Sequence, residues 1–217
     1  MPETNQTILV FCAHSDDQIF GPGAAIIKYA KQGHKIHTYI FSYGESALAW
    51  LKPEEAVKIR VKEAKNVDKF IGGHGVVFYG LKEGKFEEQA KKINLQNKII
   101  NTIKSKHPDK IFTHSPDDPH PDHRATYNIV TEALDKIKYK GDVYVFDVWN
   151  PVTIRKRDLP KLYEDVTDTL KLKVEALKLF KSQKMALITL LWSVYVRAIV
   201  HGFHIHKRFA ERFFKIR

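Results

Sequence analysis

Short apolar runs alternate with longer amphipathic segments along the first two thirds of the chain. The runs are rich in residues that favour β-strands, and they lie at residues 8–13, 36–42, 76–79, 110–114 and 143–148. The segments between them have apolar residues at helical spacing and predict helices over 19–31, 53–71, 86–106 and 122–137. This alternation is typical of α/β proteins. We therefore predict a Rossmann-like three-layer sandwich around a mostly parallel sheet.

The pattern changes after residue 150. One short strand is predicted at 165–169, and helices follow over 170–182 and 185–200. A length of 217 residues leaves room for one compact domain. We therefore predict a single domain over 1–217, with an α/β core over about 7–150 and a helical C-terminal extension over 151–217.

The apolar stretch 185–196 ends at Arg197, well short of the about 20 residues that a spanning helix needs. We interpret it as a helix packed on the α/β core, with a helix lying on a membrane surface as the alternative. The net charge is +11, from 36 Lys and Arg against 25 Asp and Glu. We expect this charge to give a salt-sensitive, transient attraction to anionic substrates or membrane surfaces. The sequence contains no recognised nucleic-acid module, so we expect no specific nucleic-acid partner.

The cysteine content and the first residues bear on location. A single cysteine, Cys12, excludes an intrachain disulfide and a thiolate metal site. The first residues carry an acid and no basic segment ahead of a short apolar run, unlike a signal peptide. We expect a cytoplasmic protein, and a homo-oligomer stays open.

Two polar clusters directly follow predicted strands. His14 and Asp17 come after the first strand, and His123 follows the fourth. Because the carboxyl ends of parallel strands meet at one edge of a sheet, these side chains are expected to lie together. Two imidazoles and one carboxylate, with a position left for water, form the ligand set of a catalytic zinc site. The sequence thus predicts a Zn²⁺ site at His14, Asp17 and His123.

Three neighbouring residues suggest acid–base chemistry. Asp16 could accept a proton from water whose pKa zinc lowers to about 7, or it could cap the following helix. His120 could donate a proton or stabilise an oxyanion, with Asp122 fixing its tautomer. Alternatively, His120 is a loop histidine and Asp122 is a residue of the first helical turn. The spacing alone leaves these alternatives open.

Residues 13–17 (Ala-His-Ser-Asp-Asp) and 119–124 (Pro-His-Pro-Asp-His-Arg) resemble the two signatures of a known family. This is the LmbE-like, or PIG-L, family of zinc-dependent N-acetylglucosaminyl deacetylases. Weaker similarities extend the resemblance over about residues 7–214, and they lie at 44–45, Arg60, Glu63, 173–183 and 210–213.

The resemblance implies a hydrolase that removes the acetyl group from an N-acetylglucosamine-type amide through zinc-activated water. The implied substrate is an N-acetylated sugar or glycoconjugate. It also implies zinc on the three predicted ligands and Asp16 as the base that activates water. His120, oriented by Asp122, would assist the tetrahedral intermediate and the leaving amine, and Arg60 would contact the sugar.

Three positions depart from the family pattern. Ser15 stands where proline is usual, Gln18 where an acid is common, and Asp118 where some members have a tyrosine near the oxyanion. None of these changes removes a predicted ligand.

The alternative function is a non-catalytic basic protein on the same fold that binds a nucleotide or an anionic surface. No Gly-x-Gly-x-x-Gly follows the first strand, where a dinucleotide-binding protein needs it. An inert protein would also have no need for the complete set of predicted site residues. The sequence therefore favours the enzyme.

Overall fold

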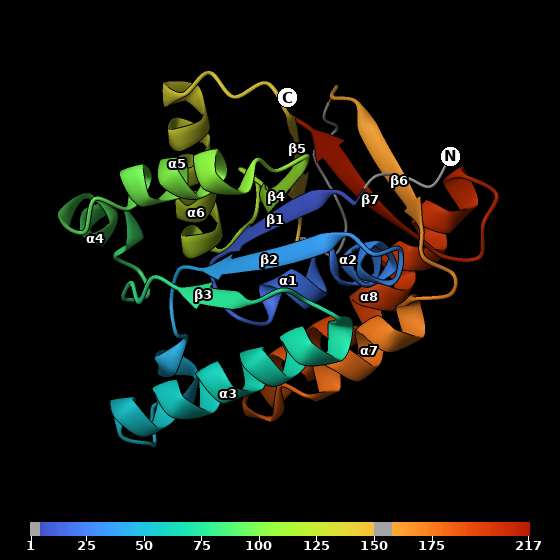
Figure 1. The fold of residues 1–217 in the computed structure, drawn as a ribbon. Helices are drawn as coiled ribbons and strands as arrows, with labels where there is room; N and C mark the ends of the chain where they lie inside the picture. Colours follow the sequence, from blue (N-terminus) through green and yellow to red (C-terminus); the bar gives the residue numbers. More distant parts are fainter. Residues whose placement is uncertain (1–4, 150–157) are drawn as a thin grey trace.

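The computed structural model describes residues 5–149 and 158–217, which form a seven-stranded sheet between helical layers (Figure 1). The strand order is β3-β2-β1-β4-β5-β7-β6. Five strands pair in parallel, namely β1 (Thr7–Cys12), β2 (Lys35–Ile40), β3 (Val76–Phe78), β4 (Lys110–His114) and β5 (Asp142–Phe146). Two further strands complete the sheet: β7 (Ala210–Lys215) pairs antiparallel with β5 and with β6 (Lys161–Asp165). The predicted α/β class with a mostly parallel sheet is confirmed.

Helices cover both faces of the sheet, so the three predicted layers are present. One face carries α4 (Phe86–Lys92), α5 (Leu95–Lys106) and α6 (Pro121–Lys136). The other carries α1 (Asp17–Phe20), α2 (Gly23–Lys31), α3 (Pro53–Ile71), α7 (Leu170–Lys178) and α8 (Lys184–His204). Successive residues of a strand point to opposite faces. Leu9 and Phe11 of β1 therefore pack in the core under α4, α5 and α6, while Ile8 and Val10 pack in the core on the opposite face of the sheet.

Two helices predicted as continuous are each split in two. Between α1 and α2 lies Gly21-Pro22, and a Cβ at Gly21 would overlap the ring of Phe146. Between α4 and α5, Asn94 takes a left-handed backbone conformation with a φ of 52°, which ends the helical run. Apolar periodicity continues through both breaks, so the periodicity alone could not locate them.

The C-terminal strands differ from the prediction. Strand β6 ends at Asp165, so the strand predicted at 165–169 is displaced, and Thr169 instead precedes α7. Strand β7 was not predicted. Its sequence places Glu211 and Arg212 in the middle of the strand, which obscures the alternation of apolar residues. Two short 3₁₀ helices, Glu45–Leu48 and Lys181–Gln183, complete the described elements.

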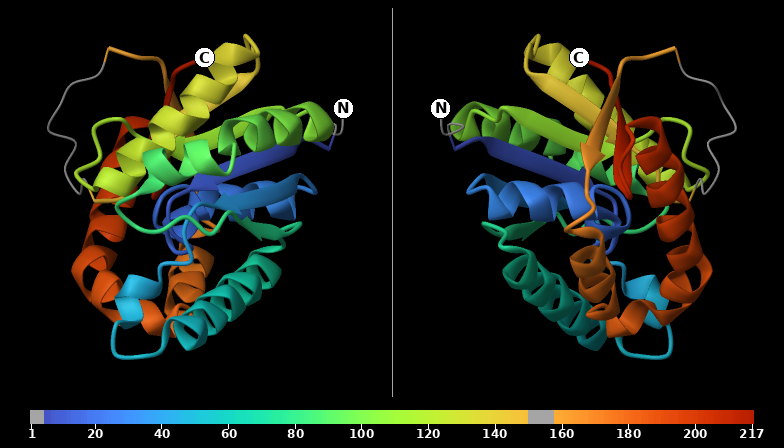
Figure 2. Two further views of the ribbon diagram at one scale, coloured as in Figure 1. Left: turned by 90° about the vertical axis from the view of Figure 1, so that its left-hand side faces the viewer. Right: turned by 90° about the vertical axis from the view of Figure 1, so that its right-hand side faces the viewer.

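Helix α8 runs along an outer side of the molecule and buries only its inner side (Figure 2). Leu190, Val194 and Ala198 belong to the core. Met185 and Trp192 on the outer side are exposed. The expectation that residues 185–196 are buried is therefore right for the inner side and wrong for the outer side.

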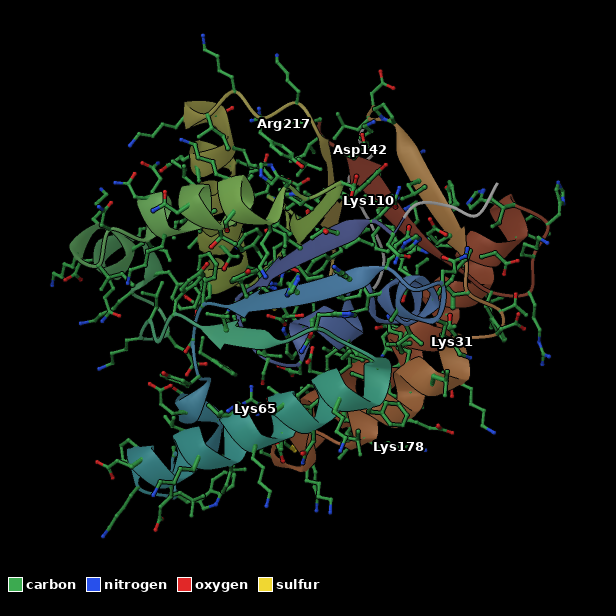
Figure 3. The ribbon with its side chains drawn as sticks, in the orientation of Figure 1. Lys31, Lys65, Lys110, Asp142, Lys178 and Arg217 are labelled. Atoms are coloured by element: carbon green, nitrogen blue, oxygen red, sulfur yellow. The ribbon has the colours of Figure 1, made fainter. Side chains whose placement is uncertain are left out.

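Many of the lysines that give the chain its positive charge lie on outer helix surfaces. Lys65 on α3 and Lys178 on α7 are both exposed (Figure 3). Cys12 is fully buried at the end of β1, and burial raises the pKa of its thiol. Cys12 therefore has no thiolate character to offer to a metal or a substrate.

Candidate metal centre and active site

The two predicted polar clusters meet at the middle of the sheet. Strands β1 and β4 are neighbours, and the chain leaves β1 towards β2 on one side while β4 lies on the other. Such a switch point leaves a crevice at the carboxyl ends of the strands. The loop of residues 13–16 follows β1, and the loop of residues 115–120 follows β4.

The structure brings the three predicted ligands together. Ligand atoms of His14, Asp17 and His123 lie within 4.8 Å of one another, and all three residues are buried. Asp17 is central, because its Oδ1 lies 3.3 Å from His123 Nε2 and its Oδ2 lies 3.4 Å from His14 Nδ1. The backbone N–H of His14 donates to the same Oδ2 at 2.8 Å, which fixes the turn after β1.

Three ring nitrogens of this cluster form no hydrogen bond among the described residues, although carboxylate oxygens lie 3.0–3.5 Å from them. They are Nε2 of His14 and both Nδ1 and Nε2 of His123. A buried polar atom without a partner is uncommon in a folded protein, and a bound ion is one explanation for it. The set His14, Asp17 and His123 could therefore hold a metal ion, and its nitrogen and oxygen donors suit zinc.

The charges around the cluster act strongly on its protonation. Burial acts to lower the pKa of His14, but Asp122, Asp17 and Asp16 raise it to about 10. Burial also acts to lower the pKa of His123, and Asp17 with Asp118 raises it to about 9. Without a metal, both imidazole rings are therefore protonated on both nitrogens, and positively charged, near neutral pH. A cation bound at this place would take over the position of those protons.

Asp16 lies beside the cluster with Arg60 behind it. Asp16 precedes α1, but its side chain makes no capping hydrogen bond, so the structure does not support the helix-cap alternative. Its Oδ1 lies 3.5 Å from Nη2 of Arg60. The Arg60 guanidinium is fully buried and also donates to the Tyr43 carbonyl at 3.2 Å and to Ser182 Oγ at 3.3 Å. Arg60 thus places a buried positive charge behind Asp16, and the contact with a sugar stays a prediction.

His120 and Asp122 both lie at the cluster, but their arrangement differs from the expected one. The backbone N–H of Asp122, not its carboxylate, contacts His120 by donating to Nδ1 at 3.2 Å. The Asp122 carboxylate instead accepts from Gly84 N at 2.9 Å and lies 3.5 Å from His14 Nε2. His120 therefore caps α6 with Nδ1 and leaves Nε2 for other contacts.

Sequence reasoning missed three residues at the site. Asp118 is fully buried, and its Oδ1 lies 3.0 Å from Nδ1 of His123. Asp118 thus lies behind a predicted ligand. His114, the last residue of β4, has Nε2 at 3.2 Å from Asp17, and burial lowers its pKa to about 4. Glu83 lies 3.4 Å from His14 Nε2.

The other departures from the family pattern are also buried in this region. Gln18 Nε2 donates to the Ser15 carbonyl at 3.3 Å, and its Oε1 accepts from Thr38 Oγ1 at 2.7 Å. Gln18 thereby ties the turn after β1 to strand β2. The Ser15 hydroxyl is buried and has no hydrogen-bond partner within the described part of the chain.

The weaker similarities form contacts that support the site from a distance. Glu63 accepts from the backbone N–H of Ser182 at 2.9 Å and from its hydroxyl, and Ser182 is the residue that Arg60 contacts. Gly44 has a φ of 71°, and a Cβ there would lie 2.7 Å from Nη2 of Arg60. The glycine is thus required both by the backbone and by the approach of the guanidinium.

Comparisons with known proteins show which family the chain belongs to. The model of the PIG-L family, described as GlcNAc-PI de-N-acetylase, matches residues 9–134, which include both site motifs. A 4-oxalmesaconate hydratase from Pseudomonas putida is 27% identical over 91% of this chain and 80% of its own length.

Two solved structures share the fold along nearly the whole chain. The N,N′-diacetylchitobiose deacetylase of Pyrococcus horikoshii has a TM-score of 0.81 at 20% identity, covering 97% of this chain and 84% of its own. The 4-carboxy-2-hydroxymuconate hydratase of Pseudomonas putida has a TM-score of 0.84 at 22% identity, covering 98% and 96%. Deacetylases and hydratases thus share this fold. Because the family model matches more than half of the chain, the chain belongs to the PIG-L family.

Proposed function

We propose that this protein is a zinc-dependent N-deacetylase that removes the acetyl group from an N-acetylglucosamine-type amide. His14, Asp17 and His123 would hold the zinc, since their donor atoms converge and buried ring nitrogens of both histidines form no hydrogen bond among the described residues. Zinc bound there supplies a Lewis acid for an amide carbonyl and lowers the pKa of water towards about 7.

Two residues of the chain would assist the reaction. Asp16 accepts the proton of the attacking water, because its carboxylate lies beside the cluster with Arg60 behind it. His120 assists the tetrahedral intermediate. Its Nδ1 accepts the backbone N–H of Asp122, so the neutral ring carries its proton on Nε2. The Nε2–H group can then donate a hydrogen bond to the oxyanion of the tetrahedral intermediate, while the proton that Asp16 took from water passes to the amine nitrogen as the C–N bond breaks.

The negative charge around the cluster is the observation that supports an amide as the substrate. The carboxylates of Asp16, Asp122 and Glu83 surround it, in addition to the predicted ligand Asp17. Arg60, which lies against Asp16, is fully buried and donates to the Tyr43 carbonyl and to Ser182 Oγ. A neutral N-acetyl sugar meets no repulsion in such a site, whereas a substrate with several carboxylates would.

The second candidate is the hydration of an unsaturated dicarboxylate, and the 27% identity to a hydratase supports it. The same Asp16 could activate water for addition to a carbon–carbon double bond. This reaction would need cationic groups to receive the carboxylates of the substrate.

The test compares both reactions on zinc-loaded protein. Acetate release from a panel of N-acetylglucosamine derivatives is measured beside the loss of alkene absorbance from unsaturated dicarboxylates. We expect acetate release, lowered by roughly 10² to 10⁴ in Asp16→Asn with zinc content unchanged. His14→Ala, Asp17→Ala and His123→Ala are expected to lose zinc. Hydration without acetate release, or equal zinc in the wild type and all three alanine variants, would contradict the proposal.

A further inference from the structure

The outer side of α8 is a continuous apolar surface with no partner among the described residues. We name it the α8 face, and its exposed side chains are Met185, Ile188, Trp192, Tyr195, Val196, Ile199, Val200 and Phe203. At 100° per residue these positions occupy an arc of about 140° and extend over roughly 27 Å of helix. Met185 is 74% exposed and Phe203 is 83% exposed. Soluble monomers rarely expose so large an apolar patch, which marks an interaction site.

The chain around the α8 face is basic and contains no acid. Between Glu175 and Glu211 the sequence has six Lys or Arg and no Asp or Glu. Lys181 and Lys184 are exposed at the start of α8, and the exposed Arg208 follows its end beside Lys207, whose ammonium lies 3.4 Å from Asp165 Oδ2. A surface that is apolar along its length and cationic at both ends complements an anionic lipid surface.

The inner side of α8 decides how the helix could meet a membrane. In length and composition the segment Lys181–His204 is apolar enough to cross a bilayer. However, Leu190, Val194 and Ala198 are buried in the core, and Arg197 donates to the Asp147 carbonyl at 2.8 Å. Crossing a bilayer would require α8 to leave the sheet. The helix is therefore placed to lie in the plane of the interface.

We propose that the α8 face docks this protein on an anionic lipid surface. The charge distribution favours lipid over a second copy of the chain. In a symmetric pairing of two α8 faces, Lys181 and Lys184 of one copy would meet cations of the other copy, whether the helices ran parallel or antiparallel. Like charges in contact across an interface are destabilising.

A neighbouring groove borders the α8 face and shares Met185 with it. This open groove of about 670 Å³ is lined by apolar side chains that include Trp50, Leu51 and Met185. Trp50 is 76% exposed and extends the apolar surface beyond α8. The groove is also lined by Ser182, which contacts Arg60. A docked protein would therefore have this groove beside the lipid surface.

The test is co-sedimentation of the full chain with vesicles of phosphatidylcholine alone or with 30% phosphatidylserine. We expect binding to the anionic vesicles at physiological salt, and weaker binding to the neutral ones. Ile188→Ser with Trp192→Ser should weaken binding at least about tenfold, because exposed apolar area is lost. Lys181→Gln and Lys184→Gln should each weaken it about fivefold. Phe70→Ser is the matched control, since Phe70 is an exposed apolar residue on α3 and should leave binding unchanged.

Tryptophan fluorescence is a second measurement, and it reports on the α8 face directly. In a Trp50→Phe/Trp149→Phe background, Trp192 is the remaining tryptophan, and its emission should shift to the blue when anionic vesicles are added. Sedimentation velocity without lipid measures self-association. Failure to bind anionic vesicles, equal binding to neutral ones, or a dimer that Trp192→Ser disrupts would each overturn the proposal. None of these measurements depends on zinc or on catalysis, so they are separable from the test of the proposed function.

Discussion

Asp118→Asn is expected to weaken zinc binding although Asp118 is not itself a predicted ligand. Its Oδ1 lies 3.0 Å from Nδ1 of His123 and accepts from the backbone N–H of His120 at 3.0 Å. Its Oδ2 accepts from the backbone N–H groups of Val148 and Trp149 at 3.0 and 3.2 Å. The carboxylate thus has N–H groups on both oxygens, and it keeps the proton of a neutral His123 on Nδ1.

An amide cannot replace this carboxylate without a conflict. If its nitrogen faces the backbone, it meets the donors of Val148 and Trp149. If its nitrogen faces His123, it favours the tautomer with the proton on Nε2, which removes the lone pair that a metal needs. We expect zinc affinity to fall about 10- to 100-fold, as for other partners of metal-ligating histidines. Since one buried donor loses its acceptor, the free energy of unfolding should fall by about 1–3 kcal/mol.

Competition with a chromophoric chelator measures the zinc affinity, and urea unfolding of the metal-free protein measures the stability. The control is Asp168→Asn, which makes the same chemical change at an exposed position before α7 and should alter neither quantity. If Asp118→Asn bound zinc as tightly as the wild type, the role assigned to this buried contact would be wrong.

Three further predictions concern the histidines of the site and the buried ion pair of Lys173 with Glu211. The pKa values of His14 and His123 are raised above the ordinary 6.5, to about 10 and about 9. Their contribution to the stability of the metal-free protein should therefore be full below pH 6.5 and lost as the pH rises through 9 to 10. Urea unfolding at several pH values measures this loss. Lys173→Met leaves buried Glu211 without its ion-pair partner and should lower the free energy of unfolding by about 3–5 kcal/mol, whereas the double change with Glu211→Gln should cost less than the sum. His120→Ala should keep its zinc while turnover falls roughly 10²- to 10⁴-fold, and loss of metal in elemental analysis would mean that the roles of His120 and His123 are exchanged.

The position of the candidate metal site could be predicted because it follows from topology. Polar residues placed directly after two parallel strands must meet if those strands are neighbours, and His14, Asp17 and His123 do meet. The roles of Asp118 and Asp122 could not be predicted in this way. Which of several carboxylates in one loop faces a given imidazole depends on the turn geometry, and the spacing in the sequence does not encode it.

The outer side of α8 shows a similar limit for the fold. Apolar residues all around a helix predict burial on every side, and α8 has apolar residues on both its inner and outer sides. The sheet and α7 provide enough surface for the inner side alone. Sequence periodicity cannot reveal how much surface the rest of the fold offers to a helix.

Lys173 and Glu211 show how distant residues come to support the site. The Lys173 ammonium donates to the carbonyls of Phe20 and Gly21 at the end of α1, and it pairs with Glu211. Glu211 in turn accepts the backbone N–H of Ala25 at 2.8 Å, at the start of α2. This ion pair therefore joins β7 and α7 to the segment directly after Asp17. The C-terminal strand missed in the sequence thus has a direct structural connection to the helix that carries a predicted metal ligand.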